Sequence, residues 1–397
     1  MLLYWIWFAQ LKKLSCSQKQ MLLRHFRDPE EIYHSDPSAF EKIENITADM
    51  LEALEERSLD EAQQILADCS HKGIGIVTQQ DSAYPSKLKN TYDAPMVLYY
   101  KGKLPDFEHL PVIGIVGTRK ATPYGMKTAA RFGATVTACG ALVVSGGAAG
   151  IDTVAMESAL AAGGSTVGVL GCGVDVVYPA KNRHLFQEVA VRGCLISEYP
   201  PKTEAYSWHF PRRNRIISGI SDGLLVVEAP EKSGALISAR FAHEQGREVF
   251  AVPGNVDEPA CAGSNALLQD FAMPALSGWD VVKEFKALYP GKISRKEAPA
   301  ASKQPEIIPE EKPKKEATDK KSIDNKEKST YSVVNNPAPA LNGQEKAVFE
   351  KLSREAVAVD AVIEATGMSA GAVKAILTRL TIKGLVQNHP GGRISRK

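Results

Sequence analysis

One stretch decides the fold of this chain, Ser145-Gly146-Gly147-Ala148-Ala149-Gly150-Ile151-Asp152. It follows 141–144, an apolar run typical of a buried strand, and its last two residues open 151–162, an alanine-rich run typical of a helix. A strand, a glycine-rich turn and a helix start aim backbone N–H groups at an anion, and glycine lets a ligand come close. The stretch predicts a phosphate-binding turn. A tight turn without a ligand is an equal alternative for one such motif taken alone.

The surrounding sequence predicts a parallel sheet wrapped by helices. Between residues 84 and 289, apolar runs alternate with helical stretches of about ten to fifteen residues. Nearly continuous apolar strands are typical of a sheet that is buried on both faces. A further run, 96–100, predicts an edge strand. The predicted central strands are 112–116, 142–144, 166–170, 194–196, 224–227 and 249–252.

Length and composition indicate several domains of an ordinary globular protein. The chain has 397 residues, 44% hydrophobic and 24% charged, which is enough for two to four domains. The net charge of +2 is too small to indicate a nucleic-acid partner by itself, so any basic surface has to be local. The six cysteines form no C-x-x-C pair, which favours reduced thiols and no metal site.

The two ends of the chain differ from its centre. Residues 1–80 repeat apolar side chains at helical spacing, which predicts a small helical domain of the sterile alpha motif or helix-hairpin-helix kind. Its first residues, 1–8, are apolar but lack the features of a signal peptide, and no run is long enough to cross a bilayer, so we expect a cytoplasmic protein without membrane contact. Residues 290–340 are rich in Pro, Lys, Glu and Ser, which predicts a charged, disordered linker.

Residues 341–397 predict a winged-helix domain. Helical patterns at 344–352, 359–365 and 370–383 are followed by a hairpin-like segment. Acidic residues end at Glu364, whereas basic residues continue to the last position. This one-sided charge favours duplex DNA contact by 370–383, and binding of another protein is an equal alternative.

Chemically distinctive residues follow the carboxyl ends of the predicted strands. In an open parallel sheet these ends meet at one edge, where ligands bind. Glycine turns and cations at one edge suit more than one phosphate. The cations expected there are Arg119, Lys181, Arg212, Arg213, Arg215 and Lys232. Aromatic side chains in the same loops are candidates for stacking on bases, with Phe210 favoured because it adjoins the arginines, and they are Tyr124, Tyr178, Tyr199, Trp208 and Phe210.

Other ligands and catalytic chemistry fit this edge less well. Gly150-Ile151-Asp152 lacks the Lys-Ser/Thr of a Walker A loop, and the first strand lacks a dinucleotide fingerprint. Asp152 stands in a first helical turn, where a carboxylate offsets the helix dipole and accepts N–H bonds. We expect Glu228 to orient a nearby Arg or Lys. His209 alone is weak evidence for a general base, so the pattern indicates a binding edge without a catalytic set.

Taken together and in order, these motifs resemble the DNA-processing protein A family (DprA, also called Smf). The resemblance covers almost all of the central domain, whereas the helical domain lacks the family's Gly-x-Gly turn. The motifs are Gly117-Thr118-Arg119 with Tyr124-Gly125, Ser145 to Asp152, Gly171-x-Gly173-x-Asp175-x-x-Tyr178-Pro179-x-x-Asn182, Phe210-Pro211-x-Arg213-Asn214-Arg215-x-Ile217, Val226-Val227-Glu228-Ala229, Lys232-Ser233-Gly234, Gly246-Arg247 and Ala251-Val252-Pro253-Gly254.

The resemblance implies a Rossmann-like core that binds single-stranded DNA, forms a homodimer, needs no cofactor and is not an enzyme. Such proteins protect incoming strands during natural transformation and load the RecA recombinase onto them. Residues at positions that match the family's DNA-binding edge are Arg119, Lys181, Phe210, Arg213, Asn214 and Lys232. With their neighbours, the expected DNA-binding set is Gly117, Thr118, Arg119, Ser145, Gly146, Gly147, Gly150, Lys181, Asn182, Phe210, Arg212, Arg213, Asn214, Arg215, Lys232, Ser233 and Gly234.

Two rival hypotheses belong to other classes of protein. A nucleotide-processing hydrolase of Rossmann-like fold would need Asp152 or Glu228 to act together with Arg119. A transcriptional regulator would read duplex DNA with its winged helix while the central domain senses a small nucleotide.

Overall fold

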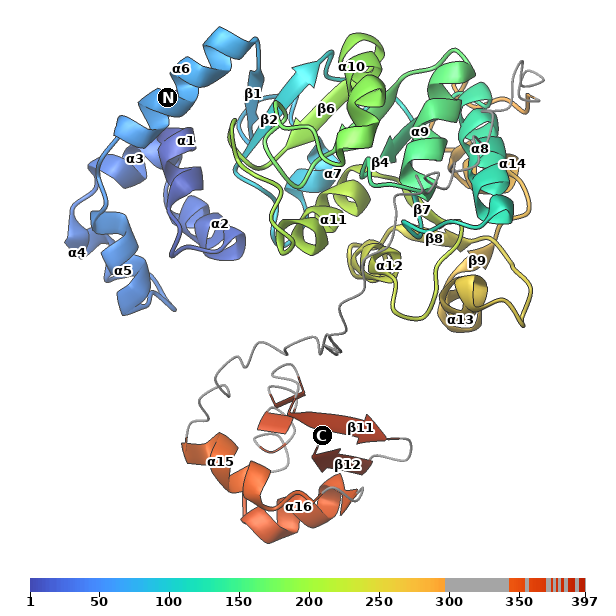
Figure 1. The fold of residues 1–397 in the computed structure, drawn as a ribbon. Coiled ribbons are helices and arrows are strands. Elements are labelled where there is room, and N and C mark those ends of the chain that lie inside the picture. Colours follow the sequence, from blue (N-terminus) through green and yellow to red (C-terminus); the bar gives the residue numbers. More distant parts are fainter. Residues whose placement is uncertain are drawn as a thin grey trace, which may run out of the picture. The chain divides into compact units, whose positions relative to one another are not determined.

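The computed structural model describes residues 1–296, 343–353, 357–368, 373, 376–377, 380–381, 385–389 and 393–396. Contacts within the chain divide it into two units, Met1–Ile308 and Pro309–Lys397. The first unit contains the N-terminal helices and the central sheet, and the second contains the C-terminal helices and a small sheet (Figure 1).

Within residues 1–296 a nine-stranded sheet runs in the order β1-β2-β6-β5-β4-β3-β7-β8-β9. Strands β3 to β9 are parallel to their neighbours, whereas β2 pairs antiparallel with both β1 and β6. The strands are β1 (Gly75–Thr78), β2 (Val97–Gly102), β3 (Val112–Val116), β4 (Leu142–Ser145), β5 (Thr166–Val169), β6 (Cys194–Ser197), β7 (Gly223–Val226), β8 (Glu248–Ala251) and β9 (Met273–Pro274).

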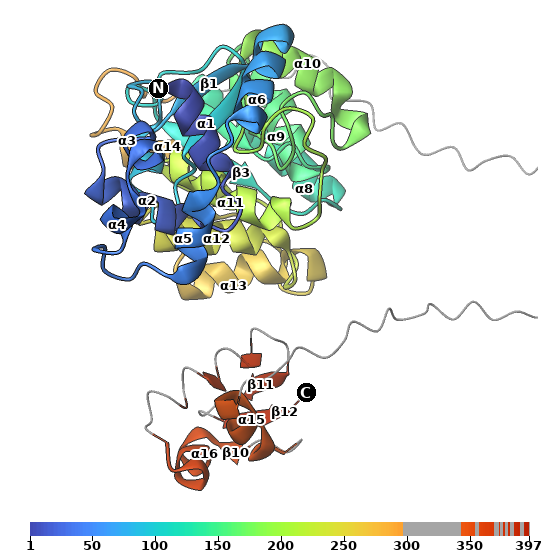
Figure 2. The ribbon, with the colours of Figure 1, turned by 90° about the vertical axis from the view of Figure 1, so that its left-hand side faces the viewer.

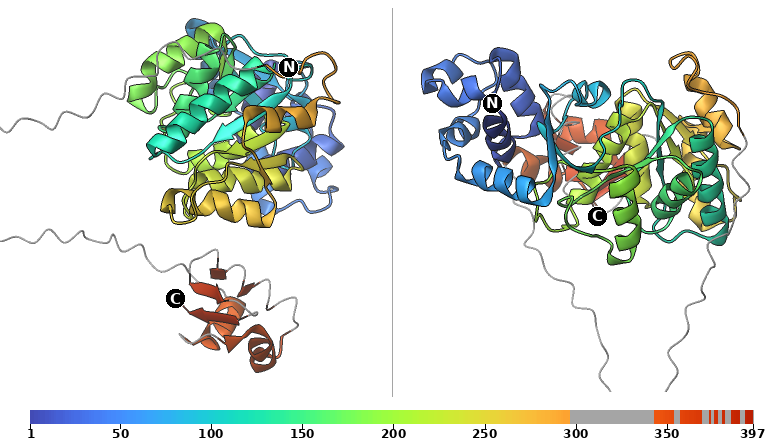
Figure 3. Two further views of the ribbon diagram at one scale, coloured as in Figure 1. Left: turned by 90° about the vertical axis from the view of Figure 1, so that its right-hand side faces the viewer. Right: turned by 90° about the horizontal axis from the view of Figure 1, so that it is seen from above.

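Helices cover both faces of this sheet (Figure 3). In β3, Val112 and Val116 join a core with α11 and α12, while Ile113 and Ile115 join a core with α8 and α9. Successive side chains of a strand point to opposite faces, so a sheet covered on both sides needs apolar residues at every position. The helices and short 3₁₀ turns are α7 (Ser86–Lys89), α8 (Pro123–Ala138), α9 (Ile151–Ala161), η1 (Ala180–Asn182), α10 (Arg183–Arg192), α11 (His209–Ile220), α12 (Gly234–Glu244), η2 (Pro259–Cys261), α13 (Ala262–Asp270), α14 (Gly278–Val282) and η3 (Lys283–Phe285).

The α/β class with a parallel core and its six central strands are confirmed, and two strands differ from the sequence prediction. Strand β2 lies inside the sheet rather than at its edge, because β1 pairs along its outer side. Strand β1 falls at 75–78, within the range assigned to the helical domain. The preceding helix ends at Gly73, whose φ of 60° is a left-handed helix cap, and the chain then turns into the sheet.

Six helices precede the sheet and pack against its β1–β2 end (Figure 2). Helix α1 is buried on most of its surface, because Trp5, Ile6, Trp7 and Phe8 all lie in a core shared with Tyr99 of β2. These helices are therefore continuous in packing with the sheet. They are α1 (Leu2–Gln10), α2 (Cys16–His25), α3 (Pro29–His34), α4 (Pro37–Phe40), α5 (Ala48–Glu55) and α6 (Asp60–Lys72).

Residues 290–296, the start of the expected linker, pack against the end of α8 within the first unit. Ile293 is buried, and the Ser294 N–H donates to the Cys139 carbonyl at 3.2 Å. The remainder of the expected linker lies outside the described residues.

The second unit combines helices with a sheet in the order β10-β12-β11, and its expected winged-helix class is confirmed. Its core includes Val348, Val362, Leu380 and Ile394. Most of the helix expected over 370–383 lies outside the described residues, including the basic residues expected to face DNA. The described elements are α15 (Gly343–Glu350), β10 (Val357–Ala358), α16 (Val359–Thr366), β11 (Val386–His389) and β12 (Arg393–Arg396).

Among the helices that the structure describes, none is both long enough and apolar enough to span a membrane.

Candidate nucleic-acid interface

The strand order reverses between β3 and β7, since β4 to β6 lie on one side of β3 and β7 to β9 on the other. Loops that leave two such strands diverge and open a crevice at their carboxyl ends. The loop after β3 starts at Gly117 and carries Arg119, and the loop after β7 carries Lys232. The Thr118 N–H donates to the Glu228 carbonyl at 2.7 Å, which ties the two loops together. We call the loops 117–122, 146–150, 170–182, 198–208 and 227–233 the carboxyl edge.

The glycine loop at 146–150 has a backbone conformation that requires glycine. Gly147 and Gly150 have φ values of 62° and 84°, in the left-handed region that disfavours other residues. A Cβ atom on Gly150 would also lie 2.4 Å from the Thr118 carbonyl oxygen. The loop is thus held against the neighbouring loop after β3, at the switch point of the sheet.

Three N–H groups of this loop, those of Gly147, Ala149 and Gly150, have no hydrogen-bond acceptor within the described residues 1–296. Two of them, on Ala149 and Gly150, belong to partly exposed residues. They precede α9, so the partial positive charge of that helix start adds to them. Free donors at a helix N-terminus favour an anion, so the glycine loop is a candidate anion site.

Asp152 and Arg213 hold the glycine loop from two sides. The Asp152 carboxylate accepts N–H bonds from Gly146 at 3.1 Å and from Ala148 at 3.4 Å. Burial raises the pKa of Asp152, and the Arg213 guanidinium and these N–H groups oppose that rise. Arg213 donates from Nη1 to the carbonyls of Gly146, at 2.6 Å, and Val169. Burial lowers the pKa of Arg213 to about 10. The expected role of Asp152 as a helix-start residue that holds the loop is confirmed, whereas Arg213 is engaged with backbone.

Two other expected site residues also support the loop from within. The Ser145 hydroxyl is fully buried and donates to the Ile115 carbonyl at 2.6 Å. Asn182 donates from Nδ2 to the Gly147 carbonyl at 2.9 Å and to the Thr153 hydroxyl at 2.8 Å. Both side chains shape the anion site, and both are buried away from solvent.

An aromatic and a cation stand beside the loop. The Phe210 ring is partly exposed and rests on Gly171, where a Cβ atom would lie 3.0 Å from the ring. The Arg119 Cζ atom lies 5.2 Å from the Phe210 ring centroid, within cation–π range. The ring of Tyr178 lies 5.3 Å from that of Phe210. The sequence analysis favoured Phe210 among the aromatics as a base-stacking residue, and that role stays a prediction.

Three of the expected cations are exposed and unpaired. Within the described residues, Arg119, Lys181 and Lys232 have no ion-pair partner. Lys120 and Arg183 at the same edge are likewise exposed, and the sequence analysis did not select them. Their position directly beside residues of the resembling motifs is the signal that would have found them.

The start of α12 reaches the same edge. The Ser233 hydroxyl accepts the Ala235 N–H at 3.3 Å as an N-cap, and Gly234 is exposed with open space around its Cα. Asn214 donates from Nδ2 to the Gly234 carbonyl at 3.3 Å and accepts from Arg213 Nε at 3.2 Å. Asn214 therefore connects α11 to the start of α12.

The segment 209–215, expected to end a loop, forms the first two turns of α11. Residues two apart on a helix point to different sides, so this segment does not present all its arginines to one surface. Arg215 is 2% exposed and pairs with Glu198, at 2.8 Å, and with Asp93, at 2.8 Å. Burial is the largest single effect on the pKa of Arg215 and lowers it, but Glu198, Asp93 and the other neighbouring groups together outweigh burial, so the net pKa is raised. Arg215 is thus part of a buried ion-pair network, and the more exposed Arg212 lies 3.7 Å from the same Glu198.

The candidate acid and base groups of a hydrolase, Glu228 and His209, already have hydrogen-bond partners inside the protein. The Glu228 carboxylate is fully buried and accepts from the Thr122 N–H at 2.8 Å and the Thr122 hydroxyl at 2.6 Å. It therefore fixes the start of α8, and the expectation that it orients an Arg or Lys was wrong. His209 lies with Nδ1 3.0 Å from the Gly171 carbonyl oxygen, and burial lowers the pKa of His209.

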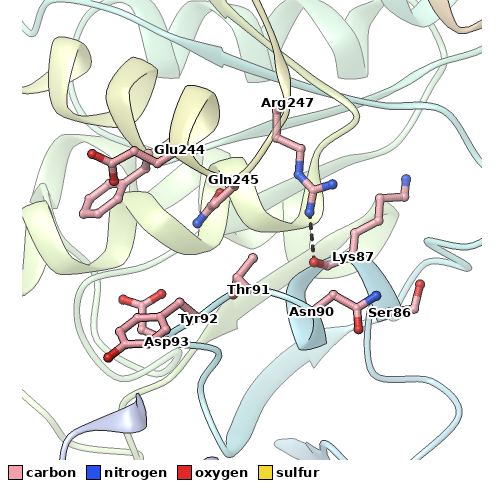
Figure 4. Close-up of a pocket in the computed structure, with 10 residues that line it drawn as sticks. Ser86, Lys87, Asn90, Thr91, Tyr92, Asp93, Glu244, Gln245 and Arg247 are labelled. Carbon is pink, nitrogen blue, oxygen red and sulfur yellow. Dashed lines mark hydrogen bonds between the residues drawn. The ribbon is translucent and has the colours of Figure 1, made fainter.

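A cavity of about 410 Å³ lies elsewhere, between the end of α12 and the segment that follows α7 (Figure 4). Arg247 donates there to the Lys87 carbonyl at 2.9 Å and to the Gly219 carbonyl at 3.0 Å. The carboxyl-terminal end of α12 points away from the carboxyl edge, because the helix starts there and runs back along the sheet. The cavity is therefore separate from the anion site. Within the described residues, no cluster of His, Cys, Asp or Glu is arranged to hold a metal ion.

Comparison with protein families places the chain in a class of DNA-processing proteins. Residues 75–286 match the family described as DNA recombination-mediator protein A, and residues 335–392 match the DprA winged helix domain. The chain belongs to the DprA/Smf family.

Relatives span most of the chain. Protein Smf of Synechocystis sp. is 32% identical over 400 residues, covering 99% of this chain and 98% of that protein. DNA processing protein DprA of Bacillus subtilis is 39% identical over 247 residues, covering 61% of this chain and 83% of that protein.

Two solved structures of DNA processing protein A are similar to this chain. The crystal structure of DprA from Streptococcus pneumoniae has a TM-score of 0.60 at 31% identity, covering 71% of this chain and 96% of that one. A structure of DNA processing protein A from Helicobacter pylori, a protein described as having a unique single-stranded DNA binding mode, has a TM-score of 0.50 at 28% identity, covering 54% of this chain and 97% of that one.

Proposed function

We propose that this chain binds single-stranded DNA at its carboxyl edge and acts as a recombination mediator. It protects incoming strands during natural transformation and loads the RecA recombinase onto them. The observation that carries the proposal is the combination, at one edge, of three free loop N–H groups with the unpaired cations Arg119, Lys181 and Lys232. The single-stranded DNA binding mode described for the similar Helicobacter pylori protein supports the choice of ligand.

A single strand suits this edge better than a duplex. The free N–H groups and cations attract any phosphate backbone. The partly exposed Phe210 ring, 5.2 Å from the Arg119 guanidinium, gives a stacking surface that needs an unpaired base. In a duplex the base faces are covered by their neighbours, so that surface would stay unused.

Binding measured over a series of salt concentrations tests both the preference for single strands and the location of the site at the carboxyl edge. Binding of labelled single strands and duplexes of equal length is measured for the full chain, for the double variant Arg119→Ala/Lys232→Ala, and for Lys103→Ala. Lys103 is an exposed cation that follows β2 beside the start of β6, at the opposite edge, and serves as the control. The double variant should lower the log–log salt slope by about 1.4, since each phosphate contact contributes about 0.7 for single strands. An unchanged slope in the double variant would remove this edge as the site.

We propose further that the chain is not an enzyme. The carboxylates of Asp152 and Glu228 already accept hydrogen bonds from the protein, which leaves no paired acid and base among these groups to face the edge. The competing hypothesis is a nucleotide-processing hydrolase that uses Asp152 with Arg119. Hydrolysis of nucleoside monophosphates by purified protein, abolished in Asp152→Asn, would decide for that alternative.

The proposed partners are RecA and a second copy of this chain, and the proposed location is the cytoplasm. The family resemblance supports the two partners. Sedimentation of the full chain tests for the dimer. Nucleation of RecA on single strands, compared with and without the chain, tests for loading. We also propose that the second unit contacts duplex DNA or another protein, and a chain ending at Lys296, which keeps the packed residue Ile293, tests its contribution to binding.

A further inference from the structure

Two aromatic side chains in the loop before α11 are exposed and stacked on each other. Tyr206 is 41% exposed and Trp208 is 64% exposed. Their ring centroids are 4.6 Å apart and their planes differ by 11°. Large aromatics stabilise a fold mainly by burial, so two that lie together on the surface leave apolar ring faces open to a partner.

The Tyr206–Trp208 pair and the Phe210 ring are both anchored at Gly171. The His209 ring meets Tyr206 and Trp208 edge-on at 5.4 and 5.5 Å, and its Nδ1 lies 3.0 Å from the Gly171 carbonyl oxygen. The Phe210 ring rests on the Cα of the same Gly171. The exposed pair and the Phe210 ring are therefore adjacent features of one edge, held on either side of His209.

An exposed cation accompanies the pair. Trp208 already has helical backbone angles, φ −73° and ψ −15°, and Arg212 lies four residues further on, so both project from the same face of α11. The Arg212 side chain is 53% exposed, and its nearest carboxylate, Glu198, is 3.7 Å away.

We propose that Tyr206 and Trp208 form a second base-stacking platform, which extends the path of the single strand past Phe210, with Arg212 beside the phosphate. This inference rests on the proposed function. The outer face of Trp208 takes an unpaired base by stacking, which tolerates any base because every base has a π face. A strand long enough to pass Phe210 and reach the platform gains affinity, whereas a shorter strand that occupies only the glycine loop and Phe210 does not.

Intrinsic fluorescence gives a direct reading of the platform. The chain has four tryptophans, of which Trp5 and Trp7 are buried and Trp279 is partly buried. Iodide therefore quenches mainly Trp208. Saturating oligo(dT) should shield Trp208 and remove most of the iodide quenching in the full chain. The variant Trp208→Phe should show little iodide quenching with or without oligo(dT).

Binding of oligo(dT) of graded length gives the energetic test. Trp208→Ala and Tyr206→Ala should each weaken binding of long oligo(dT) by about tenfold and leave the affinity for the shortest bound length unchanged. Trp208→Phe keeps an aromatic face and should stay within about twofold of the parent chain. Tyr92→Ala is the matched control, because Tyr92 is 80% exposed but lines the separate cavity of Figure 4.

The outcomes separate the platform from the proposed function. Long oligo(dT) that binds normally while Trp208 stays accessible to iodide would overturn the platform and leave the carboxyl edge intact. Trp208→Ala that binds DNA normally but sediments as a smaller species would assign the pair to a protein interface instead. A full chain that binds no oligo(dT) would overturn both the platform and the proposed function.

Discussion

Replacing Arg213 by alanine should destabilise the first unit by about 3–5 kcal/mol, because it removes a buried cation with its hydrogen bonds to two carbonyls and its attraction to a neighbouring carboxylate. The variant loses the bonds from Arg213 Nη1 to the carbonyls of Gly146 and Val169, and hydrogen bonds from charged donors contribute about 1.5–3 kcal/mol each. It also leaves the buried Asp152 carboxylate without its neighbouring cation. Arg213→Lys keeps the charge but not the planar fork, so its loss should be intermediate.

The loss of stability in Arg213→Ala should be larger at high pH than at low pH. Burial raises the pKa of Asp152, and the Arg213 guanidinium opposes that rise, so Arg213→Ala should raise it further. A carboxyl whose native pKa lies above its unfolded value stabilises the fold fully below the unfolded value and loses that contribution as pH rises through the native value. Arg213→Ala should therefore be less destabilised at about pH 5 than at about pH 8.

Urea unfolding followed by tryptophan fluorescence measures this loss. All four tryptophans lie in the first unit, so the signal reports that unit. Asp152→Asn is the control, because its side chain does not ionise and should remove the pH dependence of the Arg213→Ala effect. Two results would refute the argument that Arg213 and Asp152 together hold the glycine loop. One is a free energy of unfolding of Arg213→Ala within about 0.5 kcal/mol of the parent chain. The other is an equal loss of stability at both pH values.

Three further changes test other parts of the edge. Arg215→Ala should cost about 3–5 kcal/mol in urea unfolding, because it leaves the buried Glu198 with only the longer contact to Arg212, at 3.7 Å; a lower salt slope with normal stability would contradict that. Gly150→Ala should abolish binding of single strands, whereas Gly163→Ala, with a similar φ of 86° but no atom near its Cβ, should only lower stability. Lys120→Ala should reduce the salt slope by about 0.7 if it contacts a phosphate, and an unchanged slope would place it outside the path.

The central strands could be predicted because of where they lie. A sheet covered by helices on both faces excludes water from every side chain, so strands such as 112–116 appear as continuous apolar runs. Strand β1 and the start of α11 carried no such signal. Strand β1 has four residues and is only half buried, and α11 opens with His209-Phe210-Pro211, which resembles a loop. Both take their form from what they pack against.

The sequence by itself determined which chemical groups gather at the carboxyl edge, because parallel strands bring the residues that follow them to one side of the sheet. Only the tertiary structure decided which of those groups stay exposed and unpaired. Arg213 turns inward to the glycine loop and Arg215 to Glu198, while Arg119 and Lys232 remain free among the residues that the structure describes. The reason is physical: whether a side chain of a helix or loop is paired depends on carboxylates and carbonyls supplied by segments far away in the chain, and only folding brings these together.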